Sequence, residues 1–141
     1  MSPSGLLYLA DGNRIRVISN ATSAVTTLAG TLVAAFANGF GTNALFSSPS
    51  GVAFNASGFA IVGDTGNALL RAVDPLGSVT TLAGTGAVGA VDGAASSASF
   101  SGIAGVTELA GVIYGARRGS CALRCEWGVC TCTGGNRDRA V

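Results

Sequence analysis

The sequence repeats itself with a period of about 54 residues. The hexapeptide Val-Thr-Thr-Leu-Ala-Gly at residues 25–30 recurs at residues 79–84, and the same offset relates Phe46 to Phe100 and Gly51 to Gly105. A repeat of this length indicates that one supersecondary unit is copied along the chain, and that neighbouring copies bury a shared core. The period therefore constrains the fold more than the length of 141 residues does.

One repeat reads as four short strands. Apolar runs at residues 51–54, 59–64, 69–73 and 78–83 are separated by turn residues such as Asn, Asp, Gly and Pro. Strands spaced by 8–12 residues with turn signals between them are typical of all-β sandwiches, barrels and propellers. The sequence predicts an all-β fold in which each repeat is a four-stranded antiparallel sheet.

Longer connectors separate the repeats. Residues 31–49 and 85–104 are rich in Gly, Ala and Ser, and each ends near a matching phenylalanine, Phe46 or Phe100. We expect these two rings to anchor the connectors on the core, because a buried aromatic side chain removes a large apolar area from water.

A polar signature follows the second strand of each unit and comprises Asp11, Asn13 and Arg16 in one copy and Asp64, Asn67 and Arg71 in the next. Together with the Val-Thr-Thr-Leu-Ala-Gly strand and the Gly-rich connector, it resembles the NHL-repeat β-propellers. The resemblance covers about residues 5–116. It implies that each repeat is one blade, that about six blades close a ring, and that this chain is a partial propeller of about two and a half repeats.

The amino-acid composition excludes several kinds of chemistry. The chain has no His and no Lys, and its eight basic residues are all Arg, which stays protonated. This excludes a Ser-His-Asp or Cys-His catalytic set, a His-ligated metal and a Schiff-base lysine. A net charge of +1 gives no electrostatic basis for nucleic-acid binding, and no apolar run is long enough for a membrane span. We expect no cofactor.

Asp64 and Asn67 are weak candidates for a cation site, because their oxygens could converge with inter-blade loops on one face of a ring. The alternative is that the signature carboxylates accept hydrogen bonds within their own turns. Recurrence of the signature in both units favours this structural interpretation, since a structural requirement repeats with every blade.

Two N-glycosylation sequons are present, at Asn20 and Asn55. In the four-strand unit, Asn20 falls between strands three and four and Asn55 between strands one and two. Turns alternate between the two edges of a meander, so both asparagines are expected on one face of the ring, opposite the Asp11 and Asp64 turns.

The last part of the chain departs from the repeat. Residues 117–141 contain all four cysteines, Cys121, Cys125, Cys130 and Cys132, and five of the eight arginines. We divide the chain into blades at residues 1–116, including only the start of a third, and a Cys-rich tail at residues 117–141. Two disulfides with three possible pairings are favoured over a four-thiolate zinc site, whose cysteines usually form wider-spaced Cys-x2-Cys pairs.

Disulfides indicate an oxidising compartment, so the expected location is extracellular or at the cell surface. The first ten residues fit a blade strand and lack the charged start of a signal peptide. A fragment of a longer extracellular protein would reconcile the two observations.

The sequence predicts a non-enzymatic binding or structural module that presents repeat surfaces to a protein, a glycan or copies of itself. One alternative is a ring or filament subunit completed by strand exchange between copies, through open blade edges. Another is a fragment of a propeller enzyme of the lactonase or lyase type, which the resemblance implies, with a carboxylate-held cation.

Overall fold

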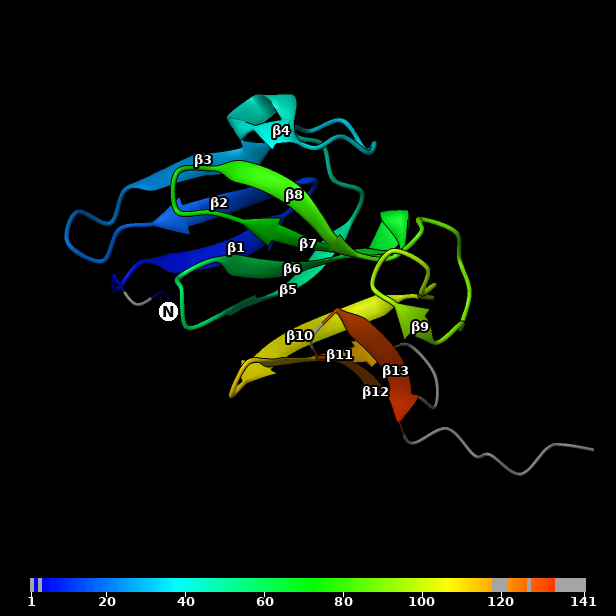
Figure 1. Ribbon diagram of the computed structural model, residues 1–141. Coiled ribbons are helices and arrows are strands. Elements are labelled where there is room, and N and C mark those ends of the chain that lie inside the picture. The colour runs from blue at the N-terminus through cyan, green and yellow to red at the C-terminus, as the bar shows by residue number, and fades with distance from the viewer. Residues whose placement is uncertain (1, 3, 118–121, 127, 134–141) are drawn as a thin grey trace, which may run out of the picture.

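Three antiparallel sheets, packed side by side, make up the computed structural model, which describes residues 2, 4–117, 122–126 and 128–133 (Figure 1). The first blade contains β1 (Leu7–Asp11), β2 (Arg14–Ile18) and β3 (Val25–Gly30) in that order. The second contains, from its inner edge outwards, β5 (Pro49–Phe54), β6 (Ala60–Asp64), β7 (Leu69–Val73) and β8 (Ser78–Ala83). The third contains β10 (Ile103–Leu109), β11 (Val112–Arg117), β12 (Ala122–Glu126) and β13 (Val129–Thr133).

The all-β prediction is confirmed, and the architecture is that of a partial β-propeller. The strands predicted at residues 69–73 and 78–83 are β7 and β8, and the other two agree with β5 and β6 to within two residues. Apolar runs bounded by turn residues locate these strands well, because β6 and β7 are buried along their whole length between neighbouring blades.

The third blade continues past the predicted boundary at residue 116. Strands β12 and β13 pair with β11 in one sheet, so the described part of the Cys-rich tail supplies the third and fourth strands of this blade. The repeat pattern in the sequence predicted only the start of a third blade. Leu123 and Cys125 alternate with Arg124 and Glu126, which is a strand pattern once the cysteine is counted as an apolar residue.

Two hydrophobic cores lie between the blades. The first joins the first and second blades, and the second joins the second and third blades. Phe46 and Phe100 are 0% and 2% exposed in these cores, which confirms that they anchor the two connectors.

Each connector also adds a short strand to the outer edge of the blade that follows it. Strand β4 (Gly39–Phe40) pairs with β8, and β9 (Gly93–Ala94) pairs with β13. A connector therefore begins at the end of one blade and pairs with the outermost strand of the next blade.

Glycine is required where the inner strands of neighbouring blades meet. Gly51 has φ +64°, and a Cβ atom there would lie 2.7 Å from the Cα of Gly105 and the nitrogen of Val106. A side chain at this position would push β5 and β10 apart, which explains the glycine at position 51.

Candidate functional site

The second-blade signature forms a buried ion pair. Asp64 ends β6 and Arg71 lies in β7, and both side chains are 0% exposed. The Arg71 Nη1 atom is 2.8 Å from Asp64 Oδ2, and the Asn67 amide donates a second hydrogen bond of 2.8 Å to the same oxygen. The backbone N–H of Ser47 donates to the other carboxylate oxygen, Oδ1, at 2.8 Å.

The signature fastens the first connector to the second blade. Arg71 donates to the carbonyl oxygens of Ala37 at 2.7 Å and Leu45 at 3.2 Å, and to the side chain of Asn38 at 2.8 Å. Asn67 donates to the carbonyl oxygen of Ala35 at 2.9 Å. The carbonyl oxygens of Ala37 and Leu45 also accept from each other's backbone N–H groups across an isolated bridge, so Arg71 adds further hydrogen bonds to a narrow part of the connector that is already paired.

Two phenylalanines of the connector enclose the arginine. The Arg71 guanidinium carbon lies 4.9 Å from the ring centroid of Phe36 and 5.2 Å from that of Phe46. A guanidinium stacked on aromatic rings is stabilised by the quadrupoles of the rings and is shielded from water. The cluster of Asp64, Asn67, Arg71 and Phe46 is therefore a structural clamp for the connector.

The first-blade signature is assembled but uncovered. Asp11 Oδ2 accepts from Arg14 at 2.9 Å and from Arg16 at 3.0 Å, as Asp64 accepts from Arg71. The side chains of Asp11, Arg14 and Arg16 are 38%, 26% and 31% exposed. Asn13 bonds to both ends of the first connector: its amide donates to the carbonyl oxygen of Leu32, and its side-chain oxygen accepts from the backbone N–H of Ser48.

Hydrogen-bond donors of the protein occupy the Asp64 carboxylate. Both of its oxygens accept hydrogen bonds from Ser47, Asn67 and Arg71, and the charge of Arg71 balances its own. Within the described residues, no three or more Asp, Glu, Cys or His side chains cluster in a way that could hold a metal. The geometry therefore favours the structural interpretation of Asp64 and Asn67 over the cation site.

The two signature carboxylates have opposite pKa shifts. Hydrogen bonding from Arg16 is the main cause that holds the pKa of Asp11 below its ordinary value of 3.8. Burial raises the pKa of Asp64 above that value, although the hydrogen bonds from Asn67, Ser47 and Arg71 act against the shift. The same signature thus has a different electrostatic character in an exposed and in a buried setting.

We expect carboxyl-detected NMR to show Asp11 titrating below 3.8 and Asp64 above it. For Asp11, ionisation stabilises the fold at pH values above its unfolded pKa, and this contribution is lost as the pH falls through its folded pKa. For Asp64 the sign is reversed, because the folded state binds the proton more tightly than the unfolded state. Titration of Asp64 below 3.8 would contradict burial as the dominant cause.

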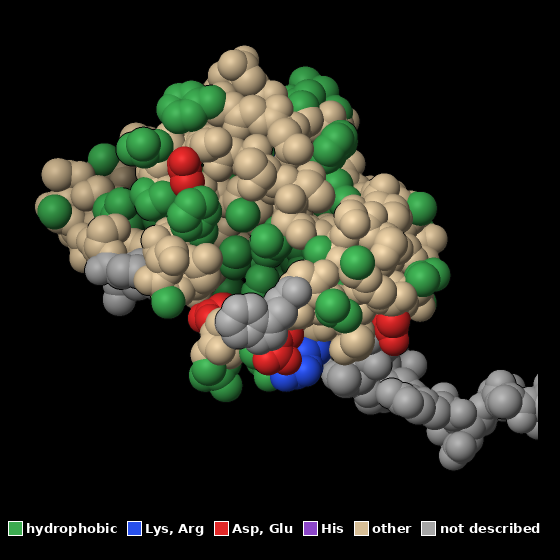
Figure 2. Space-filling view, in the orientation of Figure 1, with side chains coloured by type: hydrophobic (Ala, Val, Ile, Leu, Met, Phe, Trp, Pro, Cys, Tyr) green, Lys and Arg blue, Asp and Glu red, His purple; other side chains and the backbone are tan. Residues whose placement is uncertain are grey.

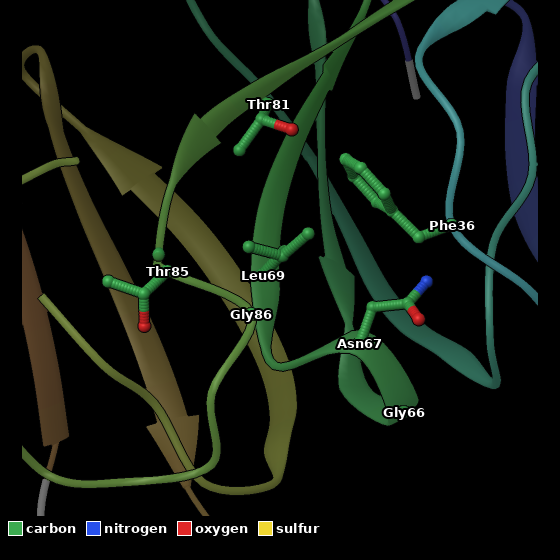
Figure 3. A pocket seen from close by; sticks show the side chains of 8 residues that line it. Phe36, Gly66, Asn67, Leu69, Thr81, Thr85 and Gly86 are labelled. Atoms are coloured by element: carbon green, nitrogen blue, oxygen red, sulfur yellow. The ribbon is translucent and has the colours of Figure 1, made fainter. Parts of the chain in front are cut away.

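A pocket of about 360 Å³ lies beside the clamp (Figure 3). Phe36 enters from the first connector, Asn67 from the turn after β6, and Leu69 from β7. Thr81 of β8 and Thr85 at the start of the second connector line the other side, and Gly66, Gly84 and Gly86 complete the lining. The pocket therefore lies where both connectors meet the end of the second blade.

The lining of this pocket is uncharged and keeps hydrogen-bonding capacity. Asn67 uses its amide nitrogen on Asp64 and Ala35, and its amide oxygen has no hydrogen-bond partner among the described residues. The Thr81 hydroxyl donates to Asn38 and can still accept, and the Thr85 hydroxyl accepts from the Ala87 backbone and can still donate. Phe36 stays 53% exposed.

Sequence reasoning missed Phe36 as a site residue. The position 54 residues later is Ala90, so the ring belongs to the first connector alone. The sequence did contain a signal for it: an aromatic residue that does not recur in the next repeat is more typical of function, because structural requirements recur with each blade. The same signal distinguishes Phe36 from the recurring pair Phe46 and Phe100.

The sequon asparagines lie in hairpin turns. Asn20 is in the turn between β2 and β3, and Asn55 in the turn between β5 and β6, on the side away from the connectors (Figure 1). Asn20 is exposed, and the side-chain oxygen of Asn55 accepts from the backbone N–H groups of Ser57 and Phe59. Glycosylation of either residue stays a prediction.

A disulfide joins Cys125 to Cys130 across the β12–β13 hairpin, where the two residues pair directly. Both residues are buried in the second core, so a zinc site that needs their thiolates is excluded. The sequence left the pairing of the four cysteines open; Cys121 lies outside the described residues, so its predicted disulfide stays a prediction.

Charged side chains are sparse on the face shown in Figure 2.

The two described 3-10 helices, Gly41–Asn43 and Thr65–Asn67, are single turns. In the part of the chain that the structure describes, no helix has the length and apolarity needed to cross a membrane.

No protein-family model matches the chain. A stretch of 72 residues is 39% identical to Protein SUPPRESSOR OF QUENCHING 1, chloroplastic, from Arabidopsis thaliana, over 50% of this chain and 7% of that protein. Two solved structures from Bacteroides thetaiotaomicron are similar in fold. One is a protein of unknown function with a TM-score of 0.74 and 22% identity, over 90% of this chain and 32% of its own.

The other is an auxiliary nutrient binding protein with a TM-score of 0.70 and 24% identity, over 82% of this chain and 33% of its own. At these identities the likeness shows the fold. The chain thus spans about a third of each structure and a small part of the plant protein.

Proposed function

We propose that the chain is a non-enzymatic glycan-binding module of an extracellular or cell-surface protein, and that the Phe36 pocket holds an uncharged sugar. The observation that carries the proposal is the pocket lining: one half-exposed aromatic ring, an amide and two hydroxyls, without an ionisable side chain. Binding sites of this kind combine apolar surface with a few placed polar groups.

Each part of the lining has a role in this proposal. The exposed face of Phe36 stacks on the C–H face of a sugar ring, while its other side is held by Arg71. The free amide oxygen of Asn67 accepts from a sugar hydroxyl, and the Thr85 hydroxyl donates to another. Because the clamp fixes Asn67 and Phe36 before binding, little side-chain freedom is lost when the sugar binds.

The location part of the proposal is supported by the Cys125–Cys130 disulfide, since such bonds persist in oxidising compartments. The repeat signature supports a relationship to NHL-type blades, which we also propose. A propeller-enzyme fragment is less favoured, because the Asp64 carboxylate that it would need for a cation is already paired with Arg71.

The test is a glycan array of neutral and acidic oligosaccharides, followed by calorimetry with the best neutral binder. We expect Phe36→Ala to weaken binding about tenfold, equivalent to about 1.4 kcal/mol, because it removes the stacking surface. Phe40→Ala is the matched control, since Phe40 is 61% exposed on the same connector and outside the pocket lining.

Binding should survive a metal chelator, because no step depends on a cation. Failure of every neutral glycan to bind would overturn the proposed function. Equal affinity of the wild-type and Phe36→Ala proteins for a bound glycan would overturn the assignment to this pocket.

A further inference from the structure

We infer that the ligand of the Phe36 pocket is a neutral oligosaccharide of at least two sugar units, an inference that rests on the proposed function. The observation behind it is a second hollow of about 470 Å³, called the β8 hollow here. Residues 81–84 at the end of β8 and residues 94–96 of the second connector line it, and Gly128 of the third blade completes the lining. The hollow lies where the second blade meets the connector to the third, so its walls belong to this chain.

The β8 hollow adjoins the Phe36 pocket. Thr81 and Gly84 line both of them. Figure 3 shows Thr81 on the strand that leads to Thr85, at the margin of the Phe36 pocket. Each hollow is larger than the roughly 300 Å³ at which small-molecule sites begin. A ligand with one sugar unit in each hollow therefore crosses from one to the other at Thr81 and Gly84.

The β8 hollow is uncharged and has unused hydrogen-bonding groups, as the Phe36 pocket does. Among the described residues, no ionisable side chain lines either hollow. Ser96 is exposed, and within the same described residues its hydroxyl has no hydrogen-bond partner. The Thr81 hydroxyl, which donates to Asn38, can still accept a hydrogen bond from a ligand. This lining matches a second neutral sugar unit.

A β-bulge provides the apolar surface of the β8 hollow. The pairing of β7 with β8 skips Leu82, because its neighbours Thr81 and Ala83 pair with consecutive residues of β7. The Leu82 side chain is 38% exposed and lines the hollow. Bulges redirect side chains at sheet edges and next to functional sites. Leu82 therefore offers apolar contact to the C–H groups of a sugar ring.

The equivalent bulge in the first blade is covered. It skips Leu28 of β3, which packs on the first core and lies against the turn at Gly77. Leu82 is the residue 54 positions later, and it stays exposed. A purely structural requirement would recur with each blade, so the open copy of this leucine favours a ligand contact.

Backbone groups at the edge of β8 extend the polar lining. Strand β4 pairs with Ser78 and Val79, and in the described part of the chain no strand pairs with the outer edge of β8 beyond Val79. Unpaired N–H and C=O groups suit sugar hydroxyls, which both donate and accept. Because the bulge at Leu82 interrupts a regular ladder, this edge fits separate hydroxyls better than an added peptide strand.

The test is calorimetry with the neutral oligosaccharide that binds best on the glycan array and with its one-unit and two-unit fragments. We expect the wild-type protein to bind the two-unit fragment about tenfold more tightly, because only this fragment reaches the β8 hollow. Ala94→Trp places an indole in the β8 hollow and should lower the affinity for the two-unit fragment to that for the one-unit fragment. Binding of the one-unit fragment should not change.

Ala90→Trp is the matched control, because Ala90 is exposed on the same connector and lines neither hollow. Ser96→Ala is a milder second variant, which should weaken binding of the two-unit fragment about fivefold by removing one hydrogen bond. A thermal melt checks that each variant is folded. Phe36→Ala should weaken binding of both fragments.

Equal affinity of the wild-type protein for the two fragments would overturn the inference and leave the proposed function standing. A folded Ala94→Trp or Ser96→Ala protein that binds the two-unit fragment as tightly as the wild type would do the same. If no neutral glycan binds at all, the proposed function fails, and the extended site fails with it.

Discussion

Replacing Asp64 with alanine is expected to lower the free energy of unfolding by about 3–5 kcal/mol, because it leaves the Arg71 charge buried without its partner. Asp64 and Arg71 are both 0% exposed, so water cannot take over the lost contact. The backbone N–H of Ser47 and the Asn67 amide lose their acceptor in the same substitution. Urea unfolding with linear extrapolation measures the change.

Asp11→Ala is the matched control, since Asp11 occupies the same signature position and pairs with Arg16 at the surface. We expect a much smaller loss of stability for this variant, because exposed ion pairs contribute little. The double variant Asp64→Ala with Arg71→Met should recover part of the loss by removing the unpaired charge. Similar losses for Asp64→Ala and Asp11→Ala would show that the clamp does not stabilise the fold.

Replacing Phe46 with alanine is expected to cost about 3–5 kcal/mol, as large-to-small substitutions of buried aromatic residues do. The ring is 0% exposed in the first core and lies against Gly30, where a Cβ atom would approach it to 2.9 Å. It also provides one of the two aromatic surfaces on which Arg71 stacks. The variant therefore leaves a cavity between the first two blades and exposes the clamp.

Phe40→Ala serves as the control for Phe46→Ala, because Phe40 is exposed at the outer edge of the second blade. Its effect should stay within about 0.5 kcal/mol. Thermal unfolding followed by circular dichroism compares the two variants. If Phe46→Ala is no more destabilised than Phe40→Ala, the connector does not depend on its anchor.

The repeat, the strands and the two anchors can be predicted from the sequence. Alternating apolar residues and turn residues locate β5 to β8 within two residues, and the offset of 54 identifies Phe46 and Phe100 as equivalent. These features are local or periodic, so they are visible without coordinates. The role of the signature as a clamp is harder to predict from the sequence. Arg71 binds the backbone carbonyl oxygens of Ala37 and Leu45, and because every residue has such an oxygen, the sequence carries no sign of the contact.

The cysteine pattern led to a wrong prediction for the third blade. Four cysteines close together indicated a separate tail, whereas Cys125 and Cys130 are buried strand residues of the blade. The Phe36 pocket was equally hidden, because its lining comes from two connectors and three parts of one blade. Such a site exists only after the chain has folded.

The sequence by itself determined the blade, its order of strands and the residues that recur in each copy, because short-range periodicity and turn chemistry act within one repeat. Only the tertiary structure decided which copy of a recurring residue is covered. Asp11 and Asp64 belong to the same signature, yet Asp11 is partly exposed and Asp64 is buried. The reason is that the first blade and the first connector pack on the signature of the second blade.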